Sequence, residues 1–249
     1  MYLGGNVMKK YFLFFLVCTL FAVFSFISLA NDTIAQADAL YNKGDMDSIL
    51  ESIPLYIMAV EANPDSYEAN WKCARAHREY ADHALEGEYE GWIDICKEYG
   101  KKGMEYGEKA IELEPEKIEG HYYFGLSAGT YSDGVSILKA LKEGLKGSTQ
   151  DAFYEAYDID KMYDIGGPML AIGRFWHKLP FPLRNKKRAE KYYKERYEYF
   201  PDDPEGLVYY AELLIDRRKK KEAKPLLEKA IMGDEPFYSN LAKEMLEDL

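Results

Sequence analysis

Amphipathic helical segments recur along this chain, and several of them end with the same short pattern. An alanine late in the helix is followed by a polar or acidic stretch and then by proline. The pattern reads AVEANP at Ala59–Pro64, AIELEP at Ala110–Pro115 and AIMGDEP at Ala230–Pro236, and RYEYFP at Arg196–Pro201 is a weaker copy. Because repetition of one pattern along a chain marks a repeat architecture, it predicts a helical-repeat protein, a class that usually works by binding.

Counting back from each alanine gives a unit close to the 34 residues of the tetratricopeptide repeat, in which small residues lie where two antiparallel helices cross. The last unit starts at Pro204 and agrees best with that pattern. Ala211, Ala223 and Ala230 occupy its small-residue positions, and Leu227 occupies a large apolar position. The agreement extends over one whole unit, which supports the register.

The register predicts an all-α fold, a tetratricopeptide-like solenoid of about five irregular helical hairpins. Alternating β-branched runs bounded by turn pairs, which would indicate strands, are not seen. The hairpins are expected at 33–63, at 67–85 with 89–113, from 118 to a second helix that carries Ala156, at 168–178 with 185–199, and from 204 onward. A further helical stretch is expected at 135–146.

Residues 1–30 have the form of a secretory signal peptide, because two lysines precede an apolar run at Tyr11–Ile27 that ends in small residues up to Ala30. Cleavage there would leave a mature chain that begins at Asn31. The alternative is an uncleaved N-terminal anchor, which would be the chain's only contact with a membrane. Either way, residues 31–249 are expected to form the repeat domain outside the cytoplasm, in the periplasm or otherwise exported.

Charge and cysteine content narrow the function further. The net charge of −11 argues against nucleic-acid binding, which needs a basic surface to displace counterions. The 22 tyrosines supply amphipathic rings suited to helix contacts and binding surfaces. In an oxidising compartment Cys73 and Cys96 could form one bridge, and two buried free thiols are the alternative.

A binding groove is expected on the concave face, which the first helix of each unit lines in tetratricopeptide superhelices. Arg174 could clamp a carboxylate of a partner peptide or an organic acid with its planar fork. The alternative is that Arg174 pairs with a neighbouring acidic side chain and the tyrosines are packing residues. The residues expected in the groove are Tyr122, Tyr123, Leu126, Leu170, Arg174, His177, Val208, Tyr209 and Glu212.

A basic edge is the second candidate site, because two clusters of cations share the same unit positions and should stack. In so acidic a chain, this edge could steer an acidic partner or lie against anionic lipid, whereas solvated turns are the ordinary explanation. The clusters are Arg184, Lys186, Lys187 and Arg188, and Arg218, Lys219, Lys220 and Lys221.

Metal and catalytic sites are not predicted, and no cofactor is expected. His77 and His83 are six residues apart on one helix and so fall on different faces. The acidic run that ends at Asp164 lacks the central glycine and the terminal glutamate of a calcium loop. No nucleophile elbow, phosphate loop or pair of catalytic carboxylates is present in the sequence, so the chain is not expected to be an enzyme.

Two segments carry a more specific resemblance. They read YYFGLSAGTYSDGVSILKALKEGL and YDIDKMYDIGGPMLAIGRFWHKLPFPL, with a Gly-Gly-Pro sequence at 166–168 and Lys-Leu-Pro at 178–180 as the distinctive parts. Residues 118–231 thereby resemble the tetratricopeptide protein family associated with TRAP transporters, called the T component. The resemblance implies a periplasmic, non-enzymatic helical protein that pairs with the solute-binding subunit of a TRAP uptake system. The chain departs from tethered members because it has no lipid-attachment motif.

The expected function is therefore a periplasmic helical-repeat binding protein, accessory to TRAP-type uptake through a solute-binding protein partner. The alternative is a generic scaffold of the cell envelope that organises protein complexes. The enlarged hairpins at 86–102 and 131–148 indicate a dedicated interface or self-association into a homo-oligomer, and this favours the first function.

Overall fold

The computed structural model describes residues 31–249, and the predicted signal peptide or anchor at 1–30 lies outside the described residues. All regular structure in the described part is helical, as predicted. After a helical segment at 31–41 come α2 (Met46–Ala62), α3 (Tyr67–Glu86), α4 (Trp92–Leu113), α5 (Ile118–Val135), α6 (Ile137–Lys142), α7 (Leu145–Asp160), α8 (Tyr163–Lys178), α9 (Lys186–Tyr199), α10 (Pro204–Asp216), α11 (Lys220–Ala230) and α12 (Pro236–Glu247).

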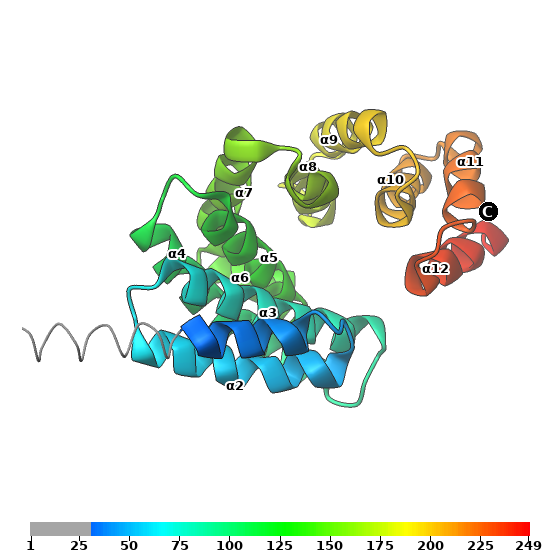
Figure 1. Ribbon diagram of the computed structural model, residues 1–249. Coiled ribbons are helices and arrows are strands. Elements are labelled where there is room, and N and C mark those ends of the chain that lie inside the picture. The colour runs from blue at the N-terminus through cyan, green and yellow to red at the C-terminus, as the bar shows by residue number, and fades with distance from the viewer. Residues whose placement is uncertain (1–30) are drawn as a thin grey trace, which may run out of the picture.

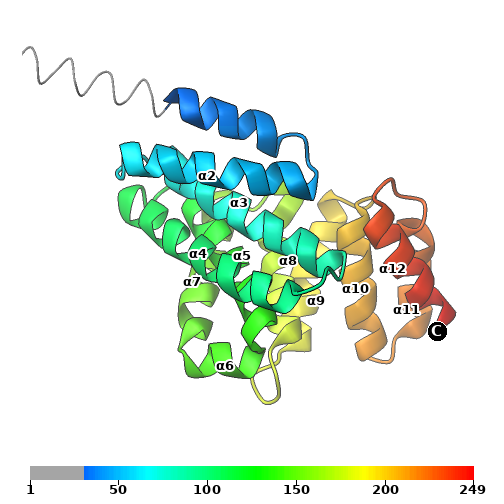
Figure 2. The ribbon, with the colours of Figure 1, turned by 90° about the horizontal axis from the view of Figure 1, so that it is seen from below.

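These helices stack as consecutive antiparallel pairs into a curved array (Figure 1). The pairs are 31–41 with α2, α3 with α4, α5 with α7, α8 with α9, and α10 with α11. They correspond to the five predicted hairpins, and α6 corresponds to the predicted additional stretch. Helix α12 follows the last hairpin and packs on α11 and α10, so it closes the C-terminal end of the array (Figure 2).

The recurring alanine–proline pattern marks helix ends, as expected. Helices α2, α4 and α9 each end two residues before a proline, whereas Pro236 opens α12. Side-chain caps fix several helix starts: Asp45, Ser66, Asn185 and Asp203 each accept a hydrogen bond from a backbone N–H in the first turn. Helix α4 begins at Trp92 rather than at the predicted 89, because Gly91 before it has a left-handed backbone with φ of 81°.

Small residues allow the helices of each hairpin to cross closely. The alanines of the pattern, Ala59, Ala110 and Ala230, are fully buried. The helices α4 and α5 come closest at a row of glycines on α4. A Cβ on Gly100 would lie 2.5 Å from the backbone nitrogen of Tyr131 and 2.8 Å from its Cα. The backbone of α5 therefore lies where a side chain at position 100 would have to be.

Replacing Gly100 with alanine is therefore expected to lower the free energy of unfolding by about 1–2 kcal/mol, because the two backbones must separate. Gly129 is the matched control, since it is also helical and a Cβ there has no neighbour within 4 Å. At Gly129, alanine should raise stability by about 0.5–1 kcal/mol through its higher helix propensity. Urea unfolding followed by circular dichroism measures both changes. The same sign at both positions would contradict the close α4–α5 crossing.

Candidate binding groove

The concave face of the array holds a groove of about 1410 Å³. The first helices of successive hairpins, α3, α5, α8 and α10, line it, and α6, the first half of α7 and α12 complete its walls. The curvature of the array places these helices around a common space because each hairpin is rotated slightly from the one before (Figure 1). The groove therefore joins residues from every hairpin after the first.

Most of the side chains predicted to line the groove do so. Among the residues named from the sequence, Tyr122, Leu126, Leu170, Arg174, Val208, Tyr209 and Glu212 belong to the lining. They come from α5, α8 and α10, which are the first helices of the last three hairpins. Tyr123 and His177 do not belong to it, and both placements correct the prediction.

Tyr123 lies in the contact between α3 and α5 instead of in the groove. Its ring stacks on Trp71 with the ring centroids 5.8 Å apart, and its hydroxyl lies 3.4 Å from that of Tyr163. Adjacent helical residues point about 100° apart, so Tyr122 and Tyr123 cannot both face the groove squarely. Tyr122 is the one that does.

His177 is buried on the side of α8 that faces α9 and α10. Its ring meets that of Tyr193, and its Nε2 lies 3.2 Å from the Oδ2 of Asp216. Burial lowers the pKa of His177. It is therefore a packing residue at this site rather than a groove residue.

Arg174 has its charge matched within the protein. Its Nη1 donates to Glu212 Oε2 at 2.7 Å, and its guanidinium lies 3.7 Å from the centre of the Tyr209 ring. Lys178 pairs with the same carboxylate. The structure therefore agrees with the second interpretation of Arg174, in which it pairs with a neighbouring acidic side chain.

The Gly-Gly-Pro sequence at the start of α8 brings this helix close to α5. A Cβ on Gly167 would collide with the hydroxyl of Tyr122, which donates to Asp164 Oδ2 at 2.8 Å. Asp164 and Ile165 both have positive φ angles, of 49° and 53°, a conformation that is unusual for a β-branched residue. Helix α8 begins with ordinary geometry only after this turn, near the predicted residue 168.

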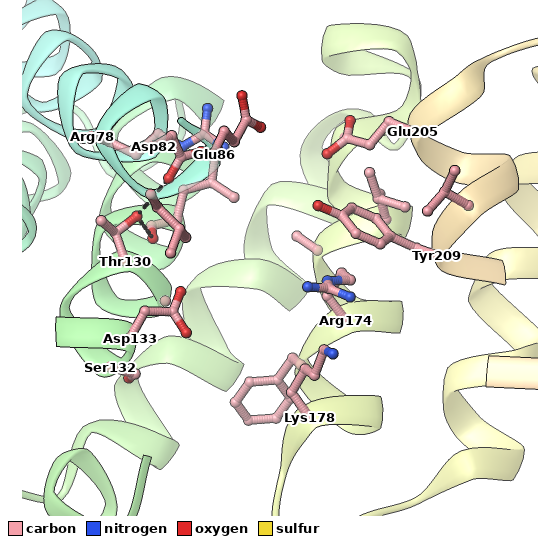
Figure 3. Close-up of a pocket in the computed structure, with 18 of the residues that line it drawn as sticks. Arg78, Asp82, Glu86, Thr130, Ser132, Asp133, Arg174, Lys178, Glu205 and Tyr209 are labelled. Atoms are coloured by element: carbon pink, nitrogen blue, oxygen red, sulfur yellow. Dashed lines mark hydrogen bonds and ion pairs between the residues drawn. The ribbon is translucent and has the colours of Figure 1, made fainter. Parts of the chain in front are cut away.

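Carboxylates on the opposite wall escaped the sequence-based prediction. Asp82 forms an ion pair with Arg78 and accepts a hydrogen bond from the hydroxyl of Thr130. Glu86 and Asp133 face the groove nearby (Figure 3). Burial, and then the charge of Asp82, raise the pKa of Glu86 to about 7 and that of Asp133 to about 6. Arg78, Asp82 and Glu86 follow one another at intervals of four residues and therefore lie on one face of α3. This spacing is the feature of the sequence from which Asp82 and Glu86 could have been predicted.

Glu205 faces these carboxylates from α10 (Figure 3), and Tyr238 of α12 connects the two walls. The hydroxyl of Tyr238 lies 3.0 Å from Glu205 Oε1 and 3.3 Å from Glu86 Oε1. Burial also raises the pKa of Glu205. The C-terminal helix therefore reaches back to α3 and closes one end of the groove.

The predicted basic edge is partly neutralised by the chain itself. Asp216 pairs with Lys186 at 3.0 Å and with Arg184 at 3.5 Å, and Glu190 pairs with Lys219 at 3.2 Å. These pairs connect neighbouring hairpins, so the two clusters adjoin. Within the described residues, the members that form no ion pair are Lys187, Arg188, Lys220, Arg218 and Lys221, of which Arg188 stacks on Trp176 and Lys220 bonds to the carbonyl of Leu249.

The cysteines and histidines of α3 and α4 form no ligand site. Cys73 and Cys96 are buried free thiols, so of the two alternatives the structure has the unbridged one. The Nδ1 of His77 lies 2.8 Å from the carbonyl oxygen of Cys73. Residues 31–249 contain no cluster of three or more side chains that could hold a metal ion. No helix in this part of the chain is long and apolar enough to cross a membrane.

Comparisons with known proteins agree with this architecture. The sequence model of the family described as regulator of microtubule dynamics protein 1-3 matches residues 33–160, about half of the chain. No curated protein sequence matches. A thermophilic tetratricopeptide protein of Thermus thermophilus is 18% identical, with a TM-score of 0.63 over 87% of this chain and 99% of that one.

PilF of Pseudomonas aeruginosa is 13% identical, with a TM-score of 0.57 over 90% of this chain and 87% of that one. The MamA protein is 16% identical, with a TM-score of 0.52 over 82% of this chain and 90% of that one. At such low identity these likenesses establish the fold alone. The fold is that of a tetratricopeptide-like helical repeat.

Proposed function

The chain belongs to the regulator of microtubule dynamics protein 1-3 family, and from this premise we propose that it is a non-enzymatic scaffold whose groove binds a segment of a protein partner. The observation that carries the proposal is the continuous groove of about 1410 Å³ along the first helices. Pockets for small molecules usually measure about 300–1,000 Å³, so this groove suits a polypeptide segment better. The family's description names regulation of a protein polymer, which is a function of the same class.

Site-specific photo-crosslinking tests this proposal. Gly129 lies on the groove wall and Gly147 does not belong to the lining, and at both a Cβ would have no neighbour within 4 Å. With p-benzoylphenylalanine at each position in turn, we expect a discrete protein adduct from position 129 and none from position 147. The captured protein is then identified, and its binding is measured with purified components. Equal adducts from both positions, or none from 129, would refute the groove as the binding site.

A more specific version is favoured by the resemblance of two segments to the T component of TRAP transporters. Those segments contain α6 and α8 and most of α5, and these helices supply a large part of the groove wall. In this version the chain is periplasmic and its partner is the solute-binding subunit of an uptake system. Identification of a solute-binding protein in the adduct would support it. Recovery of assembly factors instead would leave the general scaffold of the cell envelope as the function.

A further inference from the structure

We propose that the groove binds a basic segment of its protein partner, in which lysine or arginine side chains alternate with apolar ones. The inference rests on the proposed function and adds the chemistry of the bound segment. Three properties of the groove support it: it has carboxylates without a cation partner, part of its lining is apolar, and it is large enough for a polypeptide segment.

The guanidinium groups that line the groove and the ammonium group of Lys178 already have carboxylate partners, whereas Lys146 bonds to the amide of Gln150. The paired cations are therefore not free to bind an acidic ligand without first losing a partner inside the protein. The pairs are Arg78 with Asp82, Arg174 and Lys178 with Glu212, and Arg196 with Asp203.

Several lining carboxylates form no ion pair with any residue in 31–249, and we refer to three of them, Glu86, Asp133 and Glu205, as the groove carboxylates. Glu86 and Asp133 are on one wall, and Glu205 is on the other (Figure 3). A cation placed between the walls would therefore meet carboxylates from α3, α5 and α10. Among residues 31–249, the hydroxyl of Tyr238 is the only side-chain group that hydrogen-bonds to any of them, and it lies near Glu86 and Glu205.

The electrostatic environment of these side chains agrees with this placement. Glu86 is half-buried and faces Asp82 and Glu205, with Arg78 and Tyr238 acting in the opposite direction, and its pKa rises to about 7. Asp133 is solvent-exposed, and partial desolvation together with the charge of Asp82, opposed by Arg174 and Lys178, raises its pKa to about 6.

Glu205 is half-buried near Asp203, with Arg196, Arg78 and Tyr238 opposing, and its pKa is also raised. All three groove carboxylates are thus held where their charged forms are disfavoured. A bound ammonium or guanidinium group would stabilise those charged forms.

Apolar side chains also line the groove. Leu126, Phe153, Phe175, Val208 and Leu241 all belong to the lining. Lysine and arginine can pack their methylene stems along such a surface while the charged head reaches a carboxylate. A lining that contains both apolar and acidic side chains therefore suits a segment that carries both apolar and basic ones.

Fluorescence anisotropy with three labelled peptides tests the proposal on the purified protein. The peptides share the same leucine and alanine positions, and the other positions are all lysine, all glutamine or all glutamate. The lysine peptide should bind at least about tenfold more tightly than the glutamine peptide, and the glutamate peptide should not bind. In the variant Glu86→Gln, Asp133→Asn, Glu205→Gln, affinity for the lysine peptide should fall at least about tenfold.

The matched control removes the same charges outside the groove, with Glu108→Gln, Asp151→Asn and Glu155→Gln at exposed positions of α4 and α7. It should retain most of the affinity for the lysine peptide, because its groove carboxylates are intact. Both variants lose the same net charge, so a non-specific attraction would fall equally in both. Equal losses, or glutamine and lysine peptides that bind alike, would overturn the basic segment and leave the scaffold function standing. The scaffold function is tested separately by the crosslinking at positions 129 and 147, whose outcome does not depend on the charge of the bound segment.

Discussion

Replacing Asp203 with alanine is expected to lower the free energy of unfolding by about 3–5 kcal/mol, the largest effect anticipated for a single side chain here. Arg196 has only 3% of its side chain exposed, and its Nη1 donates to Asp203 Oδ2 at 2.6 Å. Without that carboxylate, a buried guanidinium group would lose its counterion. Asp203 also caps α10, since its Oδ2 accepts the N–H of Gly206 at 2.7 Å, and the loss of a cap adds about 1 kcal/mol.

The neighbouring Asp202 provides a matched control for this prediction. It also forms an ion pair, with Lys229 at 2.7 Å, but 85% of its side chain is exposed. Alanine at 202 should therefore change stability by less than about 1 kcal/mol. Asp203→Asn should fall between the two, because it keeps a capping oxygen and loses the charge. Thermal and urea unfolding of the three variants measure these differences, and similar losses at 202 and 203 would refute the buried pair.

Arg196 also shows where the repeat pattern was informative and where it was not. The pattern placed position 196 where other units have alanine, and the structure does bury it at a helix crossing. The guanidinium fits there because Gly206 opposite has no side chain: a Cβ on Gly206 would collide with Arg196 Nη1. A change from alanine to arginine that is matched by a glycine in the next unit cannot be predicted from one unit alone.

The groove was predictable to the extent that helix register determines it. Register assigns one face of each first helix to the concave side, and this correctly placed Tyr122, Leu170 and Tyr209. It could not separate Tyr123 from Tyr122, because Trp71 on α3 decides which ring stacks in the core. The same limit applies to charge: the sequence lists every carboxylate, but only the packing shows which ones have cation partners.

Among the features that the repeat register did not predict, helix α12 changes the groove most. The pattern of five hairpins predicts no helix after the last one, whereas Pro236 begins α12. Tyr238 on this helix then reaches Glu86, far back along the chain. The contact depends on the curvature of the whole array, which accumulates over several hairpins and has no local sequence pattern.

Neutralising the three groove carboxylates is expected to stabilise the fold at neutral and mildly alkaline pH. The variant Glu86→Gln, Asp133→Asn, Glu205→Gln should gain about 1–2 kcal/mol at pH 8, mostly from Glu86, because water screens the exposed Asp133. Glutamine keeps an acceptor for Tyr238 at both positions that it contacts. The gain arises because burial and mutual repulsion disfavour the charged carboxylates in the folded state.

The pH dependence identifies the cause of that gain. A carboxyl whose pKa is raised on folding holds its proton more tightly in the folded state, so stability falls as pH rises from the unfolded pKa to the folded one. For Glu86 that window runs from 4.5 to about 7, and for Asp133 from 3.8 to about 6. The difference between variant and wild type should therefore be near zero at pH 4, grow through pH 6 and level off above about pH 7.5.

Urea unfolding at several pH values measures this difference directly, because the other titrating groups are common to both proteins and cancel. A gain that does not depend on pH would show that better packing, and not charge, explains it. The variant that is more stable should also be the one that binds the lysine peptide more weakly. Such opposite effects are characteristic of residues kept for binding at the expense of stability, whereas residues with a structural role lose both together.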